Sequence, residues 1–146
     1  MAKKVAVSVF LTVAVLLMGA ASLRKVPREG EVTIKGETLK VEVAQTPYQM
    51  ERGLSGRSSL PQGRGIVFVF SVPGFYGFWM KEMNFPIDII WIGPDFKVVG
   101  ISGGVSPSTY PKVFTPEVPA QYVLEVAAGW SKKNKISVGD VVQSDL

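Results

Sequence analysis

Two carboxylic acids in this 146-residue chain lie in strongly apolar surroundings, where a charged group needs a partner or a function. Asp88 lies between two isoleucines, and Glu125 lies between a leucine and a valine. Two carboxyl groups held about 5–10 Å apart can perform general acid–base chemistry on a glycosidic bond. If the chain is an enzyme, Asp88 and Glu125 are therefore its candidate catalytic pair.

Basic residues near these acids offer several partnerships. Lys81 precedes Asp88 by seven residues across an Asn-Phe-Pro turn, so the two could form an ion pair between neighbouring strands. They could instead face a ligand or remain solvated. Glu125 could lie on a solvent-facing edge, or it could meet Arg57, Lys81 or Arg52 inside a cleft. We expect Arg57, Lys81, Asp88 and Glu125 to line or brace one cleft.

Aromatic side chains could provide stacking surfaces for a sugar ring or another flat ligand. The residues in question are Trp79, Trp91, Trp130, Tyr76 and Tyr122, although an aromatic residue at strand spacing more often belongs to a core. The candidate ligand-binding residues are Arg57, Trp79, Lys81, Asp88, Tyr122 and Glu125.

Composition excludes several kinds of chemistry. The chain contains no cysteine and no histidine, which rules out thiol nucleophiles, Ser-His-Asp triads, Cys/His zinc sites and disulfides. We predict no cofactor and no metal site. Oxygen ligands such as Asp88, Asn84 or Asp95 would suit a hard cation, but the sequence lacks EF-hand spacing.

The positive charge of the chain is confined to its N-terminal segment. The formal net charge is +4, and Lys3, Lys4, Arg24 and Lys25 account for all of it. The remaining chain has equal numbers of basic and acidic residues. Nucleic-acid binding depends on clustered Lys and Arg, so we expect no nucleic-acid partner.

Residues 1–25 have the pattern of a signal peptide or an N-terminal membrane anchor. Two lysines precede the apolar stretch 5–23, and Gly-Ala-Ala at 19–21 offers a cleavage site after Ala21. The stretch is longer than the usual signal core of about 7–15 residues and near the roughly 20 residues of a spanning helix. We expect an extracytoplasmic location, with the membrane as a partner if the segment is not cleaved.

The rest of the chain is predicted to form one mainly β domain. Residues 26–31 read as a tether, and 32–146 as the domain. Apolar and polar residues alternate over 32–44 around a turn at Gly36-Glu37, which predicts a hairpin with Val32, Ile34, Leu39, Val41 and Val43 facing inward.

A short helix and further strands complete this prediction. Thr46, Pro47 and Gln49 predict a capped helix that ends at Gly53. Further strands are expected at 66–70, 76–80, 87–92, 97–102, 122–127 and 135–142, with a long proline-rich loop at 103–119. The expected fold class is all-β, a single-domain β-sandwich or flattened barrel with one short helix.

These segments together resemble the domain of unknown function 192 family over residues 39–143. The matching residues are Gly53, Leu54, Arg57, Leu60, 65–68, Phe-Trp-Met-Lys at 78–81, 86–92, Val98, Val99, Pro119, Ala120, Tyr-Val-Leu-Glu at 122–125, Gly129, Gly139 and Asp140. The resemblance implies a compact, mainly β fold and no established activity. Ser55 stands where the family usually has Met, and Ser106, Ser108 and Thr109 stand in the loop where many members have two cysteines.

Two functions of different classes follow from these observations. We favour an exported binding module for a small molecule, a glycan, a cell-envelope component or a protein, with its polar cluster at one cleft. The alternative is a carboxylate-dependent enzyme that acts on a glycan or a similar envelope substrate through Asp88 and Glu125. A shared concave pocket for these two carboxyl groups would favour the enzyme.

Overall fold

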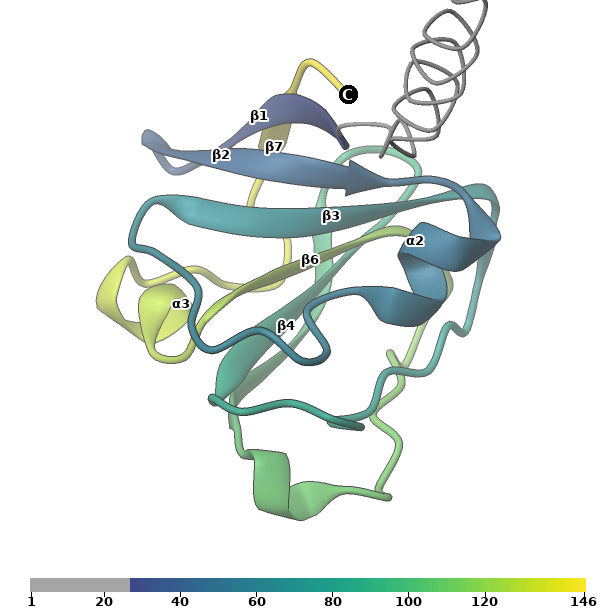
Figure 1. Ribbon diagram of the computed structural model, residues 1–146. Helices are drawn as coiled ribbons and strands as arrows, with labels where there is room; N and C mark the ends of the chain where they lie inside the picture. The colour runs from purple at the N-terminus through teal and green to yellow at the C-terminus, as the bar shows by residue number, and fades with distance from the viewer. Residues whose placement is uncertain (1–26) are drawn as a thin grey trace, which may run out of the picture.

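A computed structural model describes residues 27–146, and the predicted leader, residues 1–25, lies outside the described residues (Figure 1). The strands are β1 (Arg28–Ile34), β2 (Glu37–Ala44), β3 (Arg64–Gly74), β4 (Ile87–Ile92), β5 (Val98–Val105), β6 (Ala120–Ala127) and β7 (Val142–Ser144). The helices are α2 (Pro47–Arg52), the 3-10 turn η1 (Pro107–Thr109) and α3 (Trp130–Lys133). Between Pro27 and Leu146, no helix is both long enough and apolar enough to span a bilayer.

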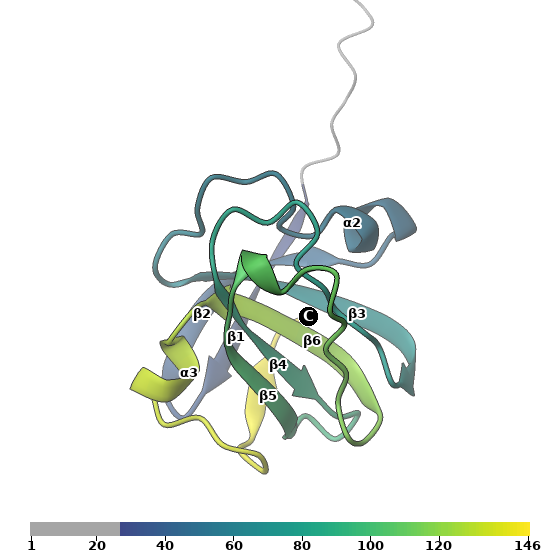
Figure 2. The same cartoon turned by 90° about the horizontal axis from the view of Figure 1, so that it is seen from below.

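The seven strands form one curled sheet in the order β5-β4-β6-β3-β2-β1-β7 (Figures 1 and 2). All pairings are antiparallel except β2 with β3, which α2 connects in parallel. A bridge between Lys97 and Val141 brings the two ends of the sheet together. The predicted all-β class is confirmed, and the architecture is a curled half-barrel.

The β1–β2 hairpin follows the predicted alternation, and all five predicted inward residues are buried. Its turn is at Lys35 and Gly36, one residue earlier than expected, with φ of 53° and 83°. Positive φ at both central residues is the geometry of a type I′ turn, which suits the twist of paired strands. Strand β1 also begins at Arg28, so most of the segment 26–31 that reads as a tether is paired with β2.

Each face of the sheet carries an apolar core. The inner core lies within the curl and includes Ile34, Val67, Ile90, Leu124 and Val142. The outer core is covered by α2 and by the segments 75–86 and 106–118, and it includes Leu54, Phe68, Met80, Trp91 and Val123. Successive residues of β6 face opposite cores, as the pleat of a strand requires.

Two expected strands do not form as predicted. Within 76–80 only Phe78 pairs, through an isolated bridge to Phe114, because the segment crosses the outer core instead of joining the sheet. Residues 135–142 contain positive φ values at Lys135 (53°) and Gly139 (95°), which interrupt an extended backbone. This region therefore forms turns between α3, which ends at Lys133, and the short strand β7.

The hydroxyl groups at the start of the long loop form hydrogen bonds with one another's backbone. Ser106 Oγ accepts a hydrogen bond from Ser108 N at 3.3 Å, and Thr109 Oγ1 donates to Ser106 O at 2.7 Å. These contacts form around η1, within residues 106–109. Strand β5 extends to Val105, so the loop begins later than the sequence predicts.

Candidate functional site

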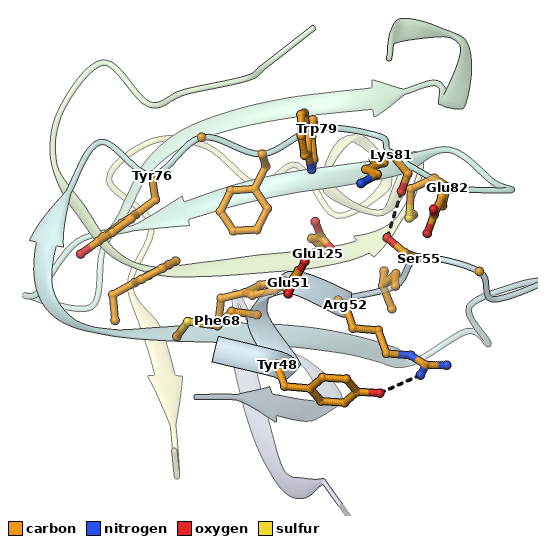
Figure 3. Close-up of a pocket in the computed structure, with 18 residues that line it drawn as sticks. Tyr48, Glu51, Arg52, Ser55, Phe68, Tyr76, Trp79, Lys81, Glu82 and Glu125 are labelled. Carbon is orange, nitrogen blue, oxygen red and sulfur yellow. Dashed lines mark hydrogen bonds between the residues drawn. The ribbon is translucent and has the colours of Figure 1, made fainter. Parts of the chain in front are cut away.

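A cavity of about 800 Å³ opens on the outer face of the sheet, between α2, β3 and the segment 76–83 (Figure 3). Its aromatic lining consists of Tyr48, Phe68, Phe70, Tyr76, Phe78 and Trp79. Its charged lining consists of Glu51, Arg52, Lys81, Glu82 and Glu125. The size and the mixture of apolar walls with a few polar groups are typical of small-molecule sites.

Local sequence fixes α2 as one wall. Thr46 Oγ1 accepts a hydrogen bond from Gln49 N at 3.3 Å, and Gln49 Oε1 accepts from Thr46 N at 3.1 Å, which together form the predicted capping box. Ser55, just beyond the helix, donates from Oγ to Lys81 O at 2.9 Å. Ser55 therefore joins the two walls of the cavity.

The opposite wall is anchored to the outer core through Trp91. Trp91 is 1% exposed, and its Nε1 donates to Tyr76 O at 3.2 Å. The Tyr76 ring stacks on Phe70 in the cavity lining, and Tyr76 Oη donates to Val72 O at 2.7 Å. This wall is thus held by packing and hydrogen bonds although it contains no regular strand.

Glu125 forms the floor of the cavity. It lies on β6 opposite Ile66 of β3 and Ile89 of β4, and only 5% of its surface is exposed. No hydrogen bond within residues 27–146 involves the Glu125 carboxyl group, which reaches the cavity, and Figure 3 shows it directed between the two walls. Burial raises its pKa to about 8, although the nearby Arg57 charge acts in the opposite direction. With this pKa the carboxyl group at the floor of the cavity is mostly protonated at neutral pH.

Arg57 does not neutralise Glu125 because it is engaged elsewhere. Its guanidinium group donates to both carboxylate oxygens of Glu42, at 2.6 and 2.8 Å. This hydrogen bonding lowers the pKa of Glu42 and raises the pKa of Arg57. A bidentate pair of this kind holds the guanidinium in a fixed orientation, so Arg57 acts on Glu125 only through its charge.

Asp88 lies away from the cavity, which corrects the expectation of one four-residue cleft. It follows the pleat onto the opposite face of the sheet from Ile89 and Glu125, and it is fully buried. Its carboxylate accepts hydrogen bonds from Gly104 N (2.7 Å), Gly129 N (3.0 Å), Ser131 N (2.9 Å) and Ser131 Oγ (2.6 Å). These contacts join β4 to β5 and α3, so Asp88 has a structural role and does not form a catalytic pair with Glu125.

The other candidates divide between the cavity and the core. Lys81 and Trp79 lie at the cavity rim, with Lys81 Nζ 5.8 Å from the Trp79 ring centroid. No ion pair joins Lys81 to Asp88 in the described part of the chain. Tyr122 faces the inner core and stacks on Phe96, at a centroid distance of 4.8 Å.

The residues considered for a hard cation also have other partners. Asn84 Nδ2 donates to Arg57 O at 2.9 Å, and Asp95 pairs with Lys97 at 3.6 Å. Together with the saturated Asp88 carboxylate, they do not form a metal site.

Sequence reasoning missed most of the aromatic lining. Tyr48, Phe68 and Phe78 were not selected because an aromatic residue at strand spacing usually belongs to a core. The available signal was the density of aromatic residues over 75–79, next to a segment with no clear alternation. Their grouping depends on α2 and 76–83 meeting across the outer face, which is a tertiary property.

The buried Glu125 predicts a pH-dependent stability. Between the ordinary pKa of 4.5 and about 8, the folded state keeps a proton that the unfolded state has lost. The free energy of unfolding should therefore fall as pH rises through this interval, by up to about 1.4 kcal/mol per pH unit, and level off above it. Denaturant titrations across this range should show the slope for the wild type and a flatter profile for Glu125→Gln.

Glu51→Gln provides the control, because Glu51 is an exposed carboxyl group on the rim of the same cavity. It should keep the wild-type pH profile. Parallel profiles for the wild type and Glu125→Gln would show that Glu125 is already ionised in the folded protein.

Comparisons with known proteins identify relatives of the same fold, and none of them has an established activity. The model of the family domain of unknown function 192 (DUF192), described as an uncharacterized ACR, matches residues 30–144. A crystal structure of a protein of unknown function from Novosphingobium aromaticivorans is 27% identical with a TM-score of 0.77, covering 85% of this chain and 91% of its own. No curated protein matches.

A second crystal structure shows the same fold. It comes from Sinorhizobium meliloti, is provisionally described as a transcription regulator, and is 29% identical with a TM-score of 0.75. The alignment covers 81% of this chain and 95% of that chain.

Proposed function

The chain belongs to the DUF192 family, and we propose that it is an extracytoplasmic domain that binds a small molecule in the cavity above Glu125. The observation that carries this proposal is the buried carboxyl group at the floor of an open cavity, without a hydrogen-bond partner among the described residues. A carboxyl group placed in this way depends on what occupies the cavity, solvent or ligand, for its hydrogen bonds. A ligand that fills the cavity would have to provide them in place of water.

The surrounding side chains support a ligand of modest size with a flat or apolar body. Trp79 is 50% exposed at the rim, and Tyr76 and Phe70 stack on each other inside. Aromatic surfaces of this type contribute large contact areas with little conformational entropy to lose.

The enzymatic alternative required Asp88 and Glu125 to share one pocket, and they do not. Asp88 is on the other sheet face, and all of its hydrogen bonds support the fold. The charge balance also offers no support for a nucleic-acid function like that suggested by the Sinorhizobium meliloti description, because residues 27–146 carry equal numbers of acidic and basic side chains.

A thermal-shift screen of sugars, nucleotides, amino acids and amines tests binding, because a ligand specific for the folded state raises the melting temperature by mass action. For any compound that binds, Trp79→Ala should weaken the affinity about five- to thirtyfold through lost stacking. Phe75→Ala is the matched control, since Phe75 is 62% exposed in the same segment but does not line the cavity. Equal effects of the two substitutions would place the ligand elsewhere.

We also propose that residues 1–25 direct the domain across or onto a membrane, on the basis of their charge and hydropathy pattern. A truncation that begins at Val26 should be soluble and folded, while the full chain should sediment with membranes. Recovery of the uncleaved full chain in the soluble fraction without detergent would contradict this proposal.

A further inference from the structure

The charges around the cavity leave an excess of negative charge when Glu125 is ionised. Three carboxyl groups line the cavity, namely Glu51, Glu82 and Glu125, against two basic groups, Arg52 and Lys81. Arg57 adds no net charge, because its bidentate pair with Glu42 is internally neutral. Arg52 donates to Tyr48 Oη at 3.0 Å on the outer side of α2 (Figure 3).

The aromatic walls, like the excess of carboxyl groups, favour a cationic ligand over an anionic one. The face of an aromatic ring is negative and attracts cations, most strongly when water is excluded. Lys81 Nζ already lies 5.8 Å from the centroid of the Trp79 ring, so an ammonium group is favourable at this rim. An anionic ligand would meet both the ring faces and the Glu125 carboxyl group without a free cation at the floor.

We propose that the ligand of this cavity carries a protonated or quaternary amine, which lies against Glu125 between the aromatic walls, on an apolar body that packs against Trp79 and Phe78. This inference rests on the proposed binding function and specifies the chemistry of its ligand. A cation at the floor satisfies the buried carboxyl group and interacts with the rings at the same time.

Binding of such a ligand is coupled to a proton. Without a bound cation Glu125 is mostly protonated at neutral pH, since burial raises the pKa of this group to about 8. The groups that face it are Arg57 from the segment after α2, with Glu42 of β2 behind it, and the rim groups Glu51, Arg52, Lys81 and Glu82. When the ammonium group arrives, Glu125 ionises and releases its proton to solvent, so affinity should rise with pH up to about 8.

Three probes with the same body and different charges test the inference on the full chain in non-ionic detergent. They are phenethyltrimethylammonium, phenethyl alcohol and phenylacetate. The quaternary amine cannot titrate, so any pH dependence of its binding belongs to the protein. We expect it to bind about tenfold or more tightly than the alcohol at pH 8, with tryptophan fluorescence and calorimetry as the readouts.

Glu125→Gln keeps the shape of the side chain and removes its charge. It should reduce the affinity for the quaternary amine about ten- to hundredfold at pH 8 and abolish both the pH dependence and the proton release. Glu117→Gln makes the same change at an exposed carboxyl group outside the cavity and should alter the affinity less than about threefold. The wild-type probe series does not depend on either variant folding.

The outcomes separate the two proposals. If the alcohol or phenylacetate binds as tightly as the amine, or if the amine does not bind, the amine inference is overturned. In that case a Trp79-dependent response to any other compound in the screen leaves the binding function intact. If no compound produces such a response, both proposals fail.

Discussion

Asp88→Asn should lower the free energy of unfolding by about 3–5 kcal/mol, the largest effect expected from any conservative change in this domain. The Asp88 carboxylate accepts four hydrogen bonds in a fully buried position. An amide at this position would place its own NH₂ group against donors from Gly104, Gly129 or Ser131. At least one buried donor would then have no acceptor. Chemical denaturation measures the loss directly.

Two substitutions serve as controls for this prediction. Asp95→Asn makes the same chemical change at an exposed residue, whose pair with Lys97 spans 3.6 Å, and it should cost less than about 1 kcal/mol. Lys81→Met should also be mild, and its effect should add to that of Asp88→Asn because the two side chains share no contact. Strong non-additivity would mean that the ion pair considered from sequence exists in solution.

Trp91→Ala should destabilise the domain by about 3–5 kcal/mol and should also weaken ligand binding. Trp91 is 1% exposed at the centre of the outer core, so its removal leaves a large cavity. The substitution also removes the Nε1 donor that holds the Tyr76 carbonyl group and thus one wall of the site. Denaturation and the binding assay should therefore both respond.

Trp79→Ala separates these two effects. Trp79 is half exposed, so its loss should change stability by less than about 1 kcal/mol while it still weakens binding. A Trp91→Ala variant with nearly wild-type stability would show that the outer core is less tightly packed than the structure indicates.

The fold was predictable where local patterns determine it. Alternation in β1 and β2 identified every inward residue, and the capping box identified α2, because both patterns record short-range geometry. The segment 76–80 has the composition of a strand but follows the outer core without a partner strand. Composition indicates that a segment is apolar and β-branched or aromatic, whereas its pairing depends on which strands are already adjacent.

The site was predictable only in part, for the same reason. Glu125 and Asp88 both appeared as carboxyl groups in apolar strands, and both are buried. The sheet register places Asp88 opposite Val126 and Glu125 opposite Ile89, so their side chains leave the sheet on opposite faces. Because they lie on opposite faces, the Asp88 carboxyl group accepts four hydrogen bonds and the Glu125 carboxyl group reaches an open cavity. The two segments, taken separately, do not show which face each side chain takes.

The pairing of β1 with β7 has a consequence for the order of events during synthesis. Val32 and Ile34 pair with Ser144 and Val142, so one edge of β1 is covered by β7, which comes after all the other strands of the sheet in the sequence. Final closure of the inner core must wait until β7 has been synthesised, however early the β1–β2 hairpin forms. Until then a chain proposed to cross a membrane would remain incompletely folded, and loss of residues 142–146 would leave the edge of β1 permanently open and exposed to pairing with other chains.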